Sequence, residues 1–232
     1  MINKIINRMR GFNKPNAKSS YSQCGEDMIV AFVFEVLGID TPFYVDIGAH
    51  NSEFINNTKY FYDKGATGIN IEPDPSLYNS FCKGRARDIN LNIGIGLEKS
   101  EMNFYRMNAS ALNTFCKETA YSYAEKGKYE VEEVIKVNVD TINSVFNQYC
   151  NEKGIDFLSV DVEGHDESII RSIDYSRYSP KVIIVETAEF SESGVTKKNT
   201  DIGDFLLNKG YFLYGDTNIN SIFVLRSLWE SR

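Results

Sequence analysis

Two short apolar runs that each stop at a carboxylate constrain the fold of this chain more than any other feature. The first is FYVDIGAHNSEF, Phe43–Phe54, with its acid at Asp46, and the second is GINIEPDP, Gly68–Pro75, with its acid at Glu72. In an open parallel sheet, ligands bind just outside the carboxyl ends of the strands, so both acids are predicted to face one crevice. An acid about 20 residues beyond a strand–glycine turn is typical of a group that binds a ribose diol.

Apolar runs elsewhere in the chain predict the rest of a parallel sheet. Strands are predicted at Phe43–Asp46, Thr67–Glu72, Ile89–Gly94, Phe157–Val162 and Lys181–Glu186. Such short runs are typical of parallel strands that are buried on both faces. Helices are predicted between them at Ile55–Lys64, Pro75–Lys83 and Ile142–Lys153. This alternation indicates an α/β fold.

The C-terminal part ends the alternation. A helix is predicted at Asp201–Asn208, and strands at Tyr211–Tyr214 and Ser221–Leu225. The connection GDTNIN is too short for a crossover, so the two strands are predicted to form an antiparallel hairpin. A mostly parallel seven-stranded sheet that ends in such a hairpin is the three-layer, Rossmann-like layout of class I methyltransferases.

The length of 232 residues fits one α/β domain, which we assign to residues 21–232. Within it, the segment 107–134 is rich in tyrosine and small polar residues and has little buried periodicity. A long insertion of this kind is either a lid over a binding site or a helical excursion that packs on the surface.

Residues 1–20 precede this domain as a basic amphipathic segment. Its apolar residues, such as Ile2, Ile6 and Met9, share one helical face, and lysines and arginines surround them. The pattern fits an interfacial helix on an anionic membrane, and it also fits a terminal helix docked on the domain. We therefore expect contact with a membrane or a biosynthetic complex, if any, through residues 1–18.

Composition excludes several classes of protein. The formal net charge of −7 argues against nucleic acid as a partner, because phosphate binding requires a basic surface. The four cysteines are far apart and form no CxxC pair, which favours reduced core residues over a disulfide framework. No apolar run reaches the ~20 residues that span a bilayer, and the N-terminus lacks the pattern of a secretory signal. A cytoplasmic location is expected, with the inner membrane face as a peripheral site.

The glycine count discriminates between nucleoside cofactors. Dinucleotides require a G-x-G-x-x-G turn for close approach of the backbone to the pyrophosphate. Here only Gly48 is present, and the turn continues with Ala49, His50, Asn51, Ser52 and Glu53. S-adenosylmethionine fits better, because it offers a ribose diol to Glu72 and carries no phosphate. Its cationic groups also tolerate an acid such as Asp46. The alternative is that both acids only cap the elements that follow them.

Four sequence blocks resemble the FkbM-type methyltransferases, which use S-adenosylmethionine. They are YSQCGED at Tyr21–Asp27, YVDIGAHNS through NNTKYF at Tyr44–Phe61, GINIEPDP at Gly68–Pro75 and IDFLSVDVEGHDESII at Ile155–Ile170. The blocks occur in the order of the family. The resemblance implies a class I methyltransferase fold and methyl transfer, usually to a hydroxyl oxygen.

The resemblance also implies roles for individual residues. Asp46 and Gly48 would line the methionine end of the cofactor, Glu72 would hold the ribose hydroxyls, and Asn92 would lie beside the adenine. The remaining residues expected around the cofactor are Gln23, Glu26, Asp27, His50, Thr58 and Asp161. One position departs from the family, because Ser52 stands where glycine is usual. A side chain there is expected to crowd the cofactor turn.

The block VDVEGHDE, Val160–Glu167, carries the candidate catalytic groups at the end of the fourth strand. Methyl transfer is an in-line displacement, so alignment supplies much of the acceleration. A hydroxyl acceptor must also lose its proton, and a positioned base assists that step. His165 is the natural candidate base, since its unperturbed pKa is near 6.5. Asp161 or Glu163 would serve instead if burial raises its pKa, or would orient the histidine.

The same acids allow two further interpretations. Asp161, Glu163 and Glu186 could ligate a hard divalent ion that binds a sugar diol. Alternatively, acids and His165 at a helix start only stabilise the helix dipole. The polar segment that follows Glu186 is expected to cover the acceptor side, with Glu189 and Phe190 as contacts.

The leading hypothesis is an S-adenosylmethionine-dependent O-methyltransferase that acts on a sugar hydroxyl in the biosynthesis of surface polysaccharide or a similar glycan. A polyketide or another small hydroxylated molecule would also suit the tyrosines of the insertion. Two alternatives come from other classes. One is a non-catalytic cofactor-binding module in a biosynthetic complex, and the other is a nicotinamide-dependent sugar oxidoreductase, which the missing glycines disfavour.

Overall fold

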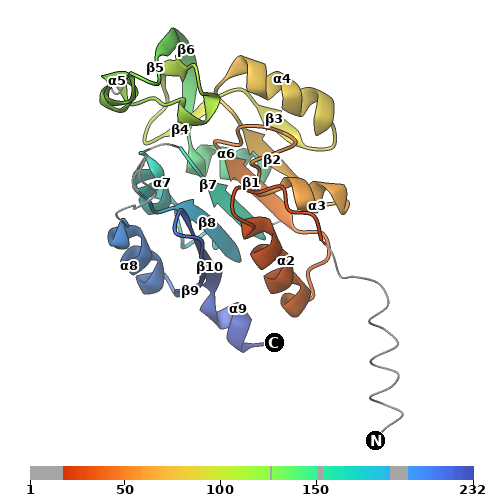
Figure 1. Cartoon of the computed structure of the whole chain (residues 1–232). Helices are drawn as coiled ribbons and strands as arrows, with labels where there is room; N and C mark the ends of the chain where they lie inside the picture. Colours follow the sequence, from red (N-terminus) through yellow and green to blue (C-terminus); the bar gives the residue numbers. More distant parts are fainter. Residues whose placement is uncertain (1–17, 126, 151–153, 163, 189–197) are drawn as a thin grey trace, which may run out of the picture.

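A seven-stranded sheet forms the centre of the computed structural model (Figure 1). The structure describes residues 18–125, 127–150, 154–162, 164–188 and 198–232. The strand order is β3-β2-β1-β7-β8-β10-β9. Its strands are β1 Phe43–Ile47, β2 Thr67–Ile71, β3 Ile89–Leu91, β7 Phe157–Val160, β8 Val182–Glu186, β9 Tyr211–Asp216 and β10 Asn220–Leu225.

The direction of the strands matches the sequence-based prediction. The five strands from β3 to β8 run parallel, and β10 runs antiparallel to both β8 and β9. Every residue of β1 and β7 is buried, as expected for strands covered on both faces. The Rossmann-like fold of methyltransferases with a C-terminal antiparallel hairpin is therefore confirmed.

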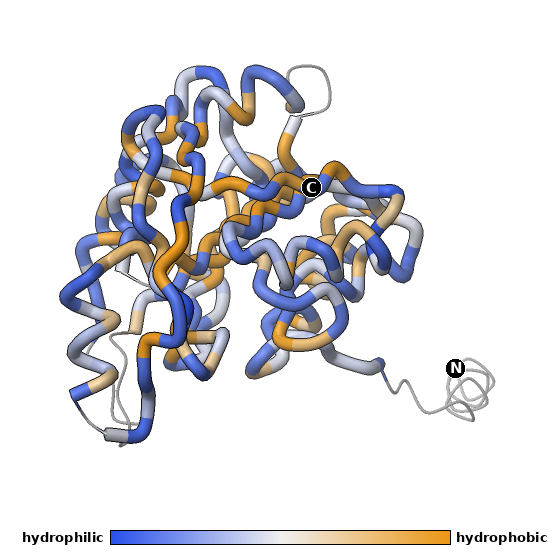
Figure 2. The backbone as a smooth tube through the Cα atoms, turned by 90° about the horizontal axis from the view of Figure 1, so that it is seen from above, coloured by the Kyte–Doolittle hydropathy of each residue, from blue (hydrophilic) through white to orange (hydrophobic). Residues whose placement is uncertain are grey.

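Helices cover both faces of this sheet and complete the three layers. On one face lie α2 Glu26–Leu37, α3 Lys59–Asp63 and α9 Arg226–Glu230, and on the other lie α6 Ile142–Tyr149, α7 Asp166–Ser172 and α8 Thr200–Asn208. Each group packs its apolar side chains on the strands in a separate core. Figure 2 shows the hydrophobic residues concentrated along the central strands. The helix α4, Pro75–Gly84, packs beside β3.

The helix predicted at Ile55–Lys64 begins later than expected, at Lys59. Ile55 has a φ of 49°, in the left-handed region that a β-branched residue rarely adopts. Asn56 then uses its side-chain oxygen to accept the N–H groups of Thr58 and Lys59, at 3.0 and 2.8 Å. The chain therefore turns through residues 55–58 before it becomes helical.

The strand predicted at Ile89–Gly94 is divided between two sheets. Its first part is β3, while Gly94–Gly96 forms β4 of a separate three-stranded sheet with the order β4-β6-β5. A Cβ on Gly94 would lie 2.4 Å from Cζ of Phe115, and one on Gly96 would lie 2.8 Å from Cγ1 of Val139. Glycine at both positions therefore lets Phe115 and β6 pack closely against β4 within the second sheet.

The segment predicted as an insertion at 107–134 is part of a larger unit. The second sheet also contains β5, Ser100–Met107, and β6, Val131–Thr141, which form a long antiparallel pair. Between them lie a short 3₁₀ helix η2, Ser110–Leu112, and the helix α5, Lys117–Glu125. We call residues 94–141 the inserted sheet. Neither sequence-based interpretation of this segment included strands.

Several smaller expectations can also be compared with the structure. The helix predicted to end at Lys153 ends at Tyr149, and residues 151–153 lie outside the described residues. The cysteines, all within the described residues, form no disulfide with one another, but only Cys150 is the buried core residue that the sequence led us to expect. The amphipathic segment 1–17 also lies outside the described residues. None of the helices in the described ranges has both the length and the apolar character that a membrane span requires.

Candidate functional site

A cavity of about 550 Å³ opens at the carboxyl ends of β1, β2, β7 and β8. One wall consists of the loops that follow these strands, and the other consists of the inserted sheet, through residues 109–115, Phe104 and Tyr129. The inserted sheet lies beside the same edge of the main sheet in Figure 1. The volume of the cavity is within the ~300–1,000 Å³ that is typical of small-molecule sites.

The two acids that end β1 and β2 both line this cavity, as predicted. Asp46 is buried, and its Oδ2 accepts hydrogen bonds from Thr58 Oγ1 at 2.8 Å and from Asn56 Nδ2 at 3.2 Å. Burial raises the pKa of Asp46, and these hydrogen bonds oppose the shift. Asn56 and Thr58, on the loop after β1, therefore fix the position of this carboxylate.

Glu72 is held by backbone donors. Its Oε2 accepts the N–H of His50, and its Oε1 accepts the N–H of Asp74, both at 2.8 Å. Burial raises the pKa of Glu72 to about 8, although these two N–H groups favour the charged form. The position lets Glu72 bind hydroxyl groups of a ligand in the cavity.

A third group of acids lies where β7 and β8 end. Asp161, Asp166 and Glu186 each place one carboxylate oxygen within 4.8 Å of the others. Loss of hydration and the negative charge of Asp166 raise the pKa of Asp161. Asp166 accepts the N–H groups of Val162 and Gly164, at 3.1 and 3.3 Å, so it caps the turn before α7.

The predicted metal ligands are partly brought together by this arrangement. Asp161 and Glu186 are close, but the third carboxylate is Asp166, and Glu163 lies outside the described residues. The oxygens of these three acids are the kind of ligand that a hard divalent cation prefers. Since Asp166 is already used as a cap, the cluster is also explained without an ion.

A smaller cavity of about 330 Å³ lies next to the first. The two cavities share Glu186 and Ala188 in their walls. The remaining wall of the smaller cavity comes from α5 through Thr119 and Tyr123, from the start of α7 and from Asn199 and Ile202. Glu186 and Ala188, at and after the end of β8, thus separate two neighbouring cavities.

Four residues expected around the cofactor do not line the main cavity. Thr58 lies behind Asp46, and Asn92 donates from Nδ2 to the carbonyl oxygens of Glu72 and Pro73, at 2.9 Å each. Asp27 accepts hydrogen bonds from Ser20, Ser22 and the N–H of Tyr21. These three residues shape the loops around the cavity.

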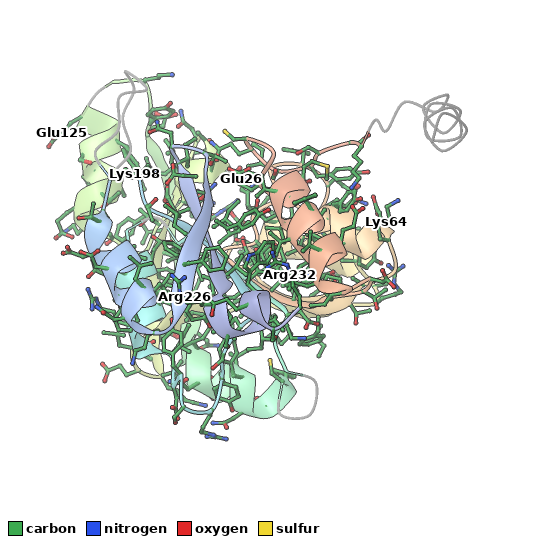
Figure 3. The ribbon with its side chains drawn as sticks, turned by 90° about the horizontal axis from the view of Figure 1, so that it is seen from below. Glu26, Lys64, Glu125, Lys198, Arg226 and Arg232 are labelled. Carbon is green, nitrogen blue, oxygen red and sulfur yellow. The ribbon has the colours of Figure 1, made fainter. Side chains whose placement is uncertain are left out.

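Glu26 is the fourth of these residues. It lies between α2 and the β9–β10 hairpin in Figure 3, where Oε1 accepts from Thr217 Oγ1 and from Asn220 Nδ2, at 2.9 Å each. The hydrogen bonds hold the pKa of this buried carboxyl below its usual value despite its burial. Glu26 therefore ties the YSQCGED block to the hairpin, while Gln23 of the same block lines the cavity.

His50 lines the cavity, and His165 does not line either cavity. His50 has a φ of 54°, and its Nε2 is 3.0 Å from Oγ of Ser110 in the inserted sheet. His165 occupies the N-cap position of α7 without a side-chain capping hydrogen bond. Of the VDVEGHDE block, Asp161 and Val162 therefore line the main cavity, and His165 lies outside the lining.

Gly48 and Ser52 have reasons for their identity that differ from those expected. A Cβ on Gly48 would lie 1.7 Å from the carbonyl oxygen of Asp161, so glycine is required where the loops after β1 and β7 meet. Ser52 is buried but does not line the cavity. Its carbonyl oxygen accepts from Nε of Arg85 at 3.1 Å. The side chain of Ser52 thus lies outside the cavity wall, and the expected crowding of the cofactor turn stays a prediction.

Sequence reasoning missed several residues of the site. Asn56 and Asn57 line the cavity, and so do the apolar side chains of Leu77, Ile93, Ile95, Phe104, Leu112 and Phe115. The block NNTKYF contained both asparagines, but only the turn at residues 55–58 brings Asn56 to Asp46, at 3.2 Å, and Asn57 to Oγ of Ser159, at 3.1 Å. No sequence spacing indicates Phe104 and Phe115, because the inserted sheet positions them.

The sheet order is that of the Rossmann-like methyltransferases, and the cavity lies at the carboxyl ends of the strands, where such sheets bind their ligands. In agreement with this, residues 46–213 match the family model described as Methyltransferase FkbM domain. The match covers more than half of the chain, so the chain belongs to the FkbM methyltransferase family. A search of curated protein sequences finds no significant match.

Proposed function

We propose that the chain is an O-methyltransferase that takes its methyl group from S-adenosylmethionine and transfers it to a sugar hydroxyl of a glycan precursor. The observation that carries the cofactor proposal is the lining of the main cavity. Asp46, Glu72 and Asp161 contribute carboxyls, and no lysine or arginine occurs among the described residues of the lining. Such a surface favours a ligand with cationic groups and opposes a pyrophosphate.

The two ends of the cavity suit the two ends of this cofactor. Asp46 would face the ammonium of the methionine part, and Glu72 would accept hydrogen bonds from the ribose hydroxyls. Leu77, Ile93, Phe104 and Phe115 provide an apolar wall for a flat base. When bound, the cofactor supplies an electrophilic methyl group on a sulfonium. The cavity residues would align the acceptor oxygen with that methyl group, and this alignment would supply most of the rate acceleration.

Asp161 is the residue that we propose as the general base. It lines the main cavity at the end of β7, and its raised pKa suits a group that removes a proton near neutral pH. Glu186 stands beside it and lines both cavities, so it would accept a hydrogen bond from a neighbouring hydroxyl. His165 remains the competing candidate from the sequence.

The acceptor proposal is supported by the polar, acid-lined space on the far side of Asp161. Thr119, Tyr123, Thr187 and Asn199 line the smaller cavity together with carboxyls. Hydroxyl-rich molecules donate hydrogen bonds to such groups, and aromatic rings offer faces to a sugar. We propose a cytoplasmic location, and we propose residues 1–18 as the contact with an anionic membrane or a biosynthetic complex.

Isothermal titration calorimetry with S-adenosylhomocysteine tests the cofactor assignment. Wild-type protein is expected to bind, and Glu72→Ala is expected to bind at least about tenfold more weakly, since a buried group left without its hydrogen-bond partner costs roughly 1–3 kcal/mol. Glu98→Ala, on the exposed surface, is the matched control and should bind as wild type does. A folded wild-type sample without affinity at high micromolar concentration, or binding of NAD instead, would refute the proposal. Binding without methyl-label transfer into any glycan pool would favour the scaffold alternative.

A further inference from the structure

Arg85 is one of the largest side chains that are completely buried in the described part of the protein. It follows α4 and lies below the loop that connects β1 to α3. Removal of a guanidinium from water is unfavourable unless charges and hydrogen bonds compensate it. The partners of Arg85 therefore indicate what this buried charge does.

On the side away from the cavity, Arg85 is bound by structural partners. Its Nη1 donates to Oη of Tyr44 at 3.3 Å and lies 3.7 Å from Oδ2 of Asp88. Tyr44 in turn donates to Oδ2 of Asp88 at 2.5 Å. The guanidinium lies 4.9 Å from the centre of the Tyr62 ring. These contacts fix the position of the charge.

On the side toward the cavity, two hydrogen-bond chains lead from Arg85 to Asp46. In the first, Nη2 donates to Oδ1 of Asn56 at 2.6 Å, and Nδ2 of Asn56 donates to Oδ2 of Asp46 at 3.2 Å. In the second, Nη1 donates to Oγ1 of Thr58 at 3.5 Å, and Thr58 donates to the same Oδ2 at 2.8 Å. Both chains thus end on one oxygen of one carboxylate.

The charged groups around Asp46 act in opposite directions. The carboxyls of Glu72 and Asp161, on the neighbouring strands β2 and β7, repel its negative charge. Burial raises the pKa of Asp46, while hydrogen bonding from Thr58 and the positive charge of Arg85 lower it. Among the described residues near Asp46, Arg85 is the cation that opposes these effects.

We propose that Arg85 is a positioning residue for cofactor binding, which orients the carboxylate of Asp46 and compensates its charge through Asn56 and Thr58. This inference depends on the proposed function, in which Asp46 faces the ammonium of S-adenosylmethionine. It adds a residue that lies outside the cavity lining. The contacts of Arg85 with Asn56 and Thr58 also explain why residues 55–58 form a turn instead of the first residues of the predicted helix.

Binding of S-adenosylhomocysteine as a function of pH tests this role in three variants. Arg85→Met removes the charge and is expected to weaken binding about tenfold at pH 7, with the acidic limb of the binding profile shifted upward by about one pH unit. Arg85→Lys retains the charge without the planar fork, so it should restore the acidic limb and only part of the affinity. Thr58→Val interrupts one chain while Arg85 stays in place, and it is expected to weaken binding about threefold, within the roughly 0.5–1.5 kcal/mol of one hydrogen bond.

Tyr44→Phe is the matched control. It removes a hydrogen bond of Arg85 on the side away from Asp46, so it should lower thermal stability and leave the acidic limb unchanged. An equal shift in Tyr44→Phe and Arg85→Met would overturn the inference, because the effect would then be general destabilisation. Unchanged binding by folded Arg85→Met would also overturn it. If that variant does not fold, unchanged binding by Thr58→Val has the same consequence.

The wild-type measurement separates this inference from the proposed function. Wild-type protein that does not bind S-adenosylhomocysteine contradicts the proposed function. Wild-type protein that binds normally, with variants that match it in affinity and pH profile, contradicts only the role of Arg85.

Discussion

The backbone N–H of His50 donates a 2.8 Å hydrogen bond to Oε2 of Glu72, so the loop after β1 is attached directly to the end of β2. The side chain of the same histidine lies 3.0 Å from Oγ of Ser110 in the inserted sheet. One residue therefore connects both strand-end loops and the opposite wall of the cavity. A change in the charge of Glu72 is therefore expected to alter the position of the inserted sheet, and a displacement of the inserted sheet is expected to alter the environment of Glu72.

The raised pKa of Glu72 predicts that the unliganded protein loses stability as the pH rises. The folded pKa is about 8, against roughly 4.3 for an unperturbed glutamate, so the folded state holds the proton more tightly. The stabilisation is complete below about pH 4 and is lost as the pH rises through about 8. Thermal unfolding between pH 5 and 9 should show this fall, and it should be smaller in Glu72→Gln.

The slope of stability against pH is the informative quantity in that experiment. The amide of Glu72→Gln places an NH₂ group opposite a backbone N–H, which lowers stability at every pH. Glu98→Gln, on the surface, should retain the wild-type slope. An identical slope in Glu72→Gln and wild type would show that another group causes the pH dependence.

Asp161→Asn is expected to reduce methyl-label transfer by at least about 100-fold, since a positioned base contributes roughly 10²–10⁴ to the rate. Affinity for S-adenosylhomocysteine should change by less than about tenfold, because one charge in the cavity is removed without a change of shape. His165→Ala is the comparison, because His165 lies outside the lining of both cavities. A large loss of transfer in His165→Ala with normal transfer in Asp161→Asn would identify His165 as the base.

The inserted sheet is also attached to the loop after β2. Asp74 accepts from Nε of Arg106 at 2.8 Å and from Nδ2 of Asn113 at 3.2 Å. Arg106→Met should therefore accelerate the dissociation of bound S-adenosylhomocysteine about fivefold, which corresponds to about 1 kcal/mol. Faster amide hydrogen exchange in residues 109–115 should accompany it.

An ion pair between β5 and β6 provides the control for Arg106→Met. Lys136 and Glu101 lie 3.9 Å apart, and both are exposed, so Lys136→Met should leave the dissociation rate unchanged. Equal effects of the two substitutions would mean that the β5–β6 pair as a whole, and not its attachment to Asp74, controls release.

Gly94→Ala should destabilise the protein by about 1–3 kcal/mol, because the new Cβ would lie 2.4 Å from Phe115 and overpacking is costly. The melting temperature should fall by roughly 2–10 °C for a chain of this size. Gly203→Ala in α8 is the matched substitution. The nearest atom to its Cβ would be 3.8 Å away, so alanine should be neutral or stabilise the helix by up to about 1 kcal/mol. A stable Gly94→Ala protein would show that Phe115 can move away from β4.

The central strands of the main sheet could be predicted because they carry the same local pattern. β1, β7 and β8 are apolar and covered on both faces, so a few residues of sequence are sufficient to identify them. The second sheet has a weaker pattern. Only Val137 and Val139 of β6 are buried, and most of the other residues of that strand are exposed. The alternation of buried and exposed residues around these two valines is the only local indication of the strand, and it is too short to identify β6 by itself.

The candidate site also contains residues that could be predicted from the sequence and residues that could not. Asp46 and Glu72 could be predicted because strand ends place them in the cavity regardless of the rest of the chain. Arg85 could not be predicted, because its role depends on contacts with Asn56 and Thr58 that only the folded turn creates. Ser52 was expected to crowd the cofactor, but its side chain is packed near Gly84, at the end of α4.

The inserted sheet forms one wall of the cavity, yet its strands pair with each other and not with the main sheet. Its length and sequence can therefore vary between related proteins without a change in the register of the strands that carry Asp46 and Glu72. A transplant of residues 94–141 between two members of the family should leave Asp46 and Glu72 in place and change the opposite wall, which includes Phe104 and Phe115. Within this architecture, one wall of the site can evolve while the strand-end acids keep their positions.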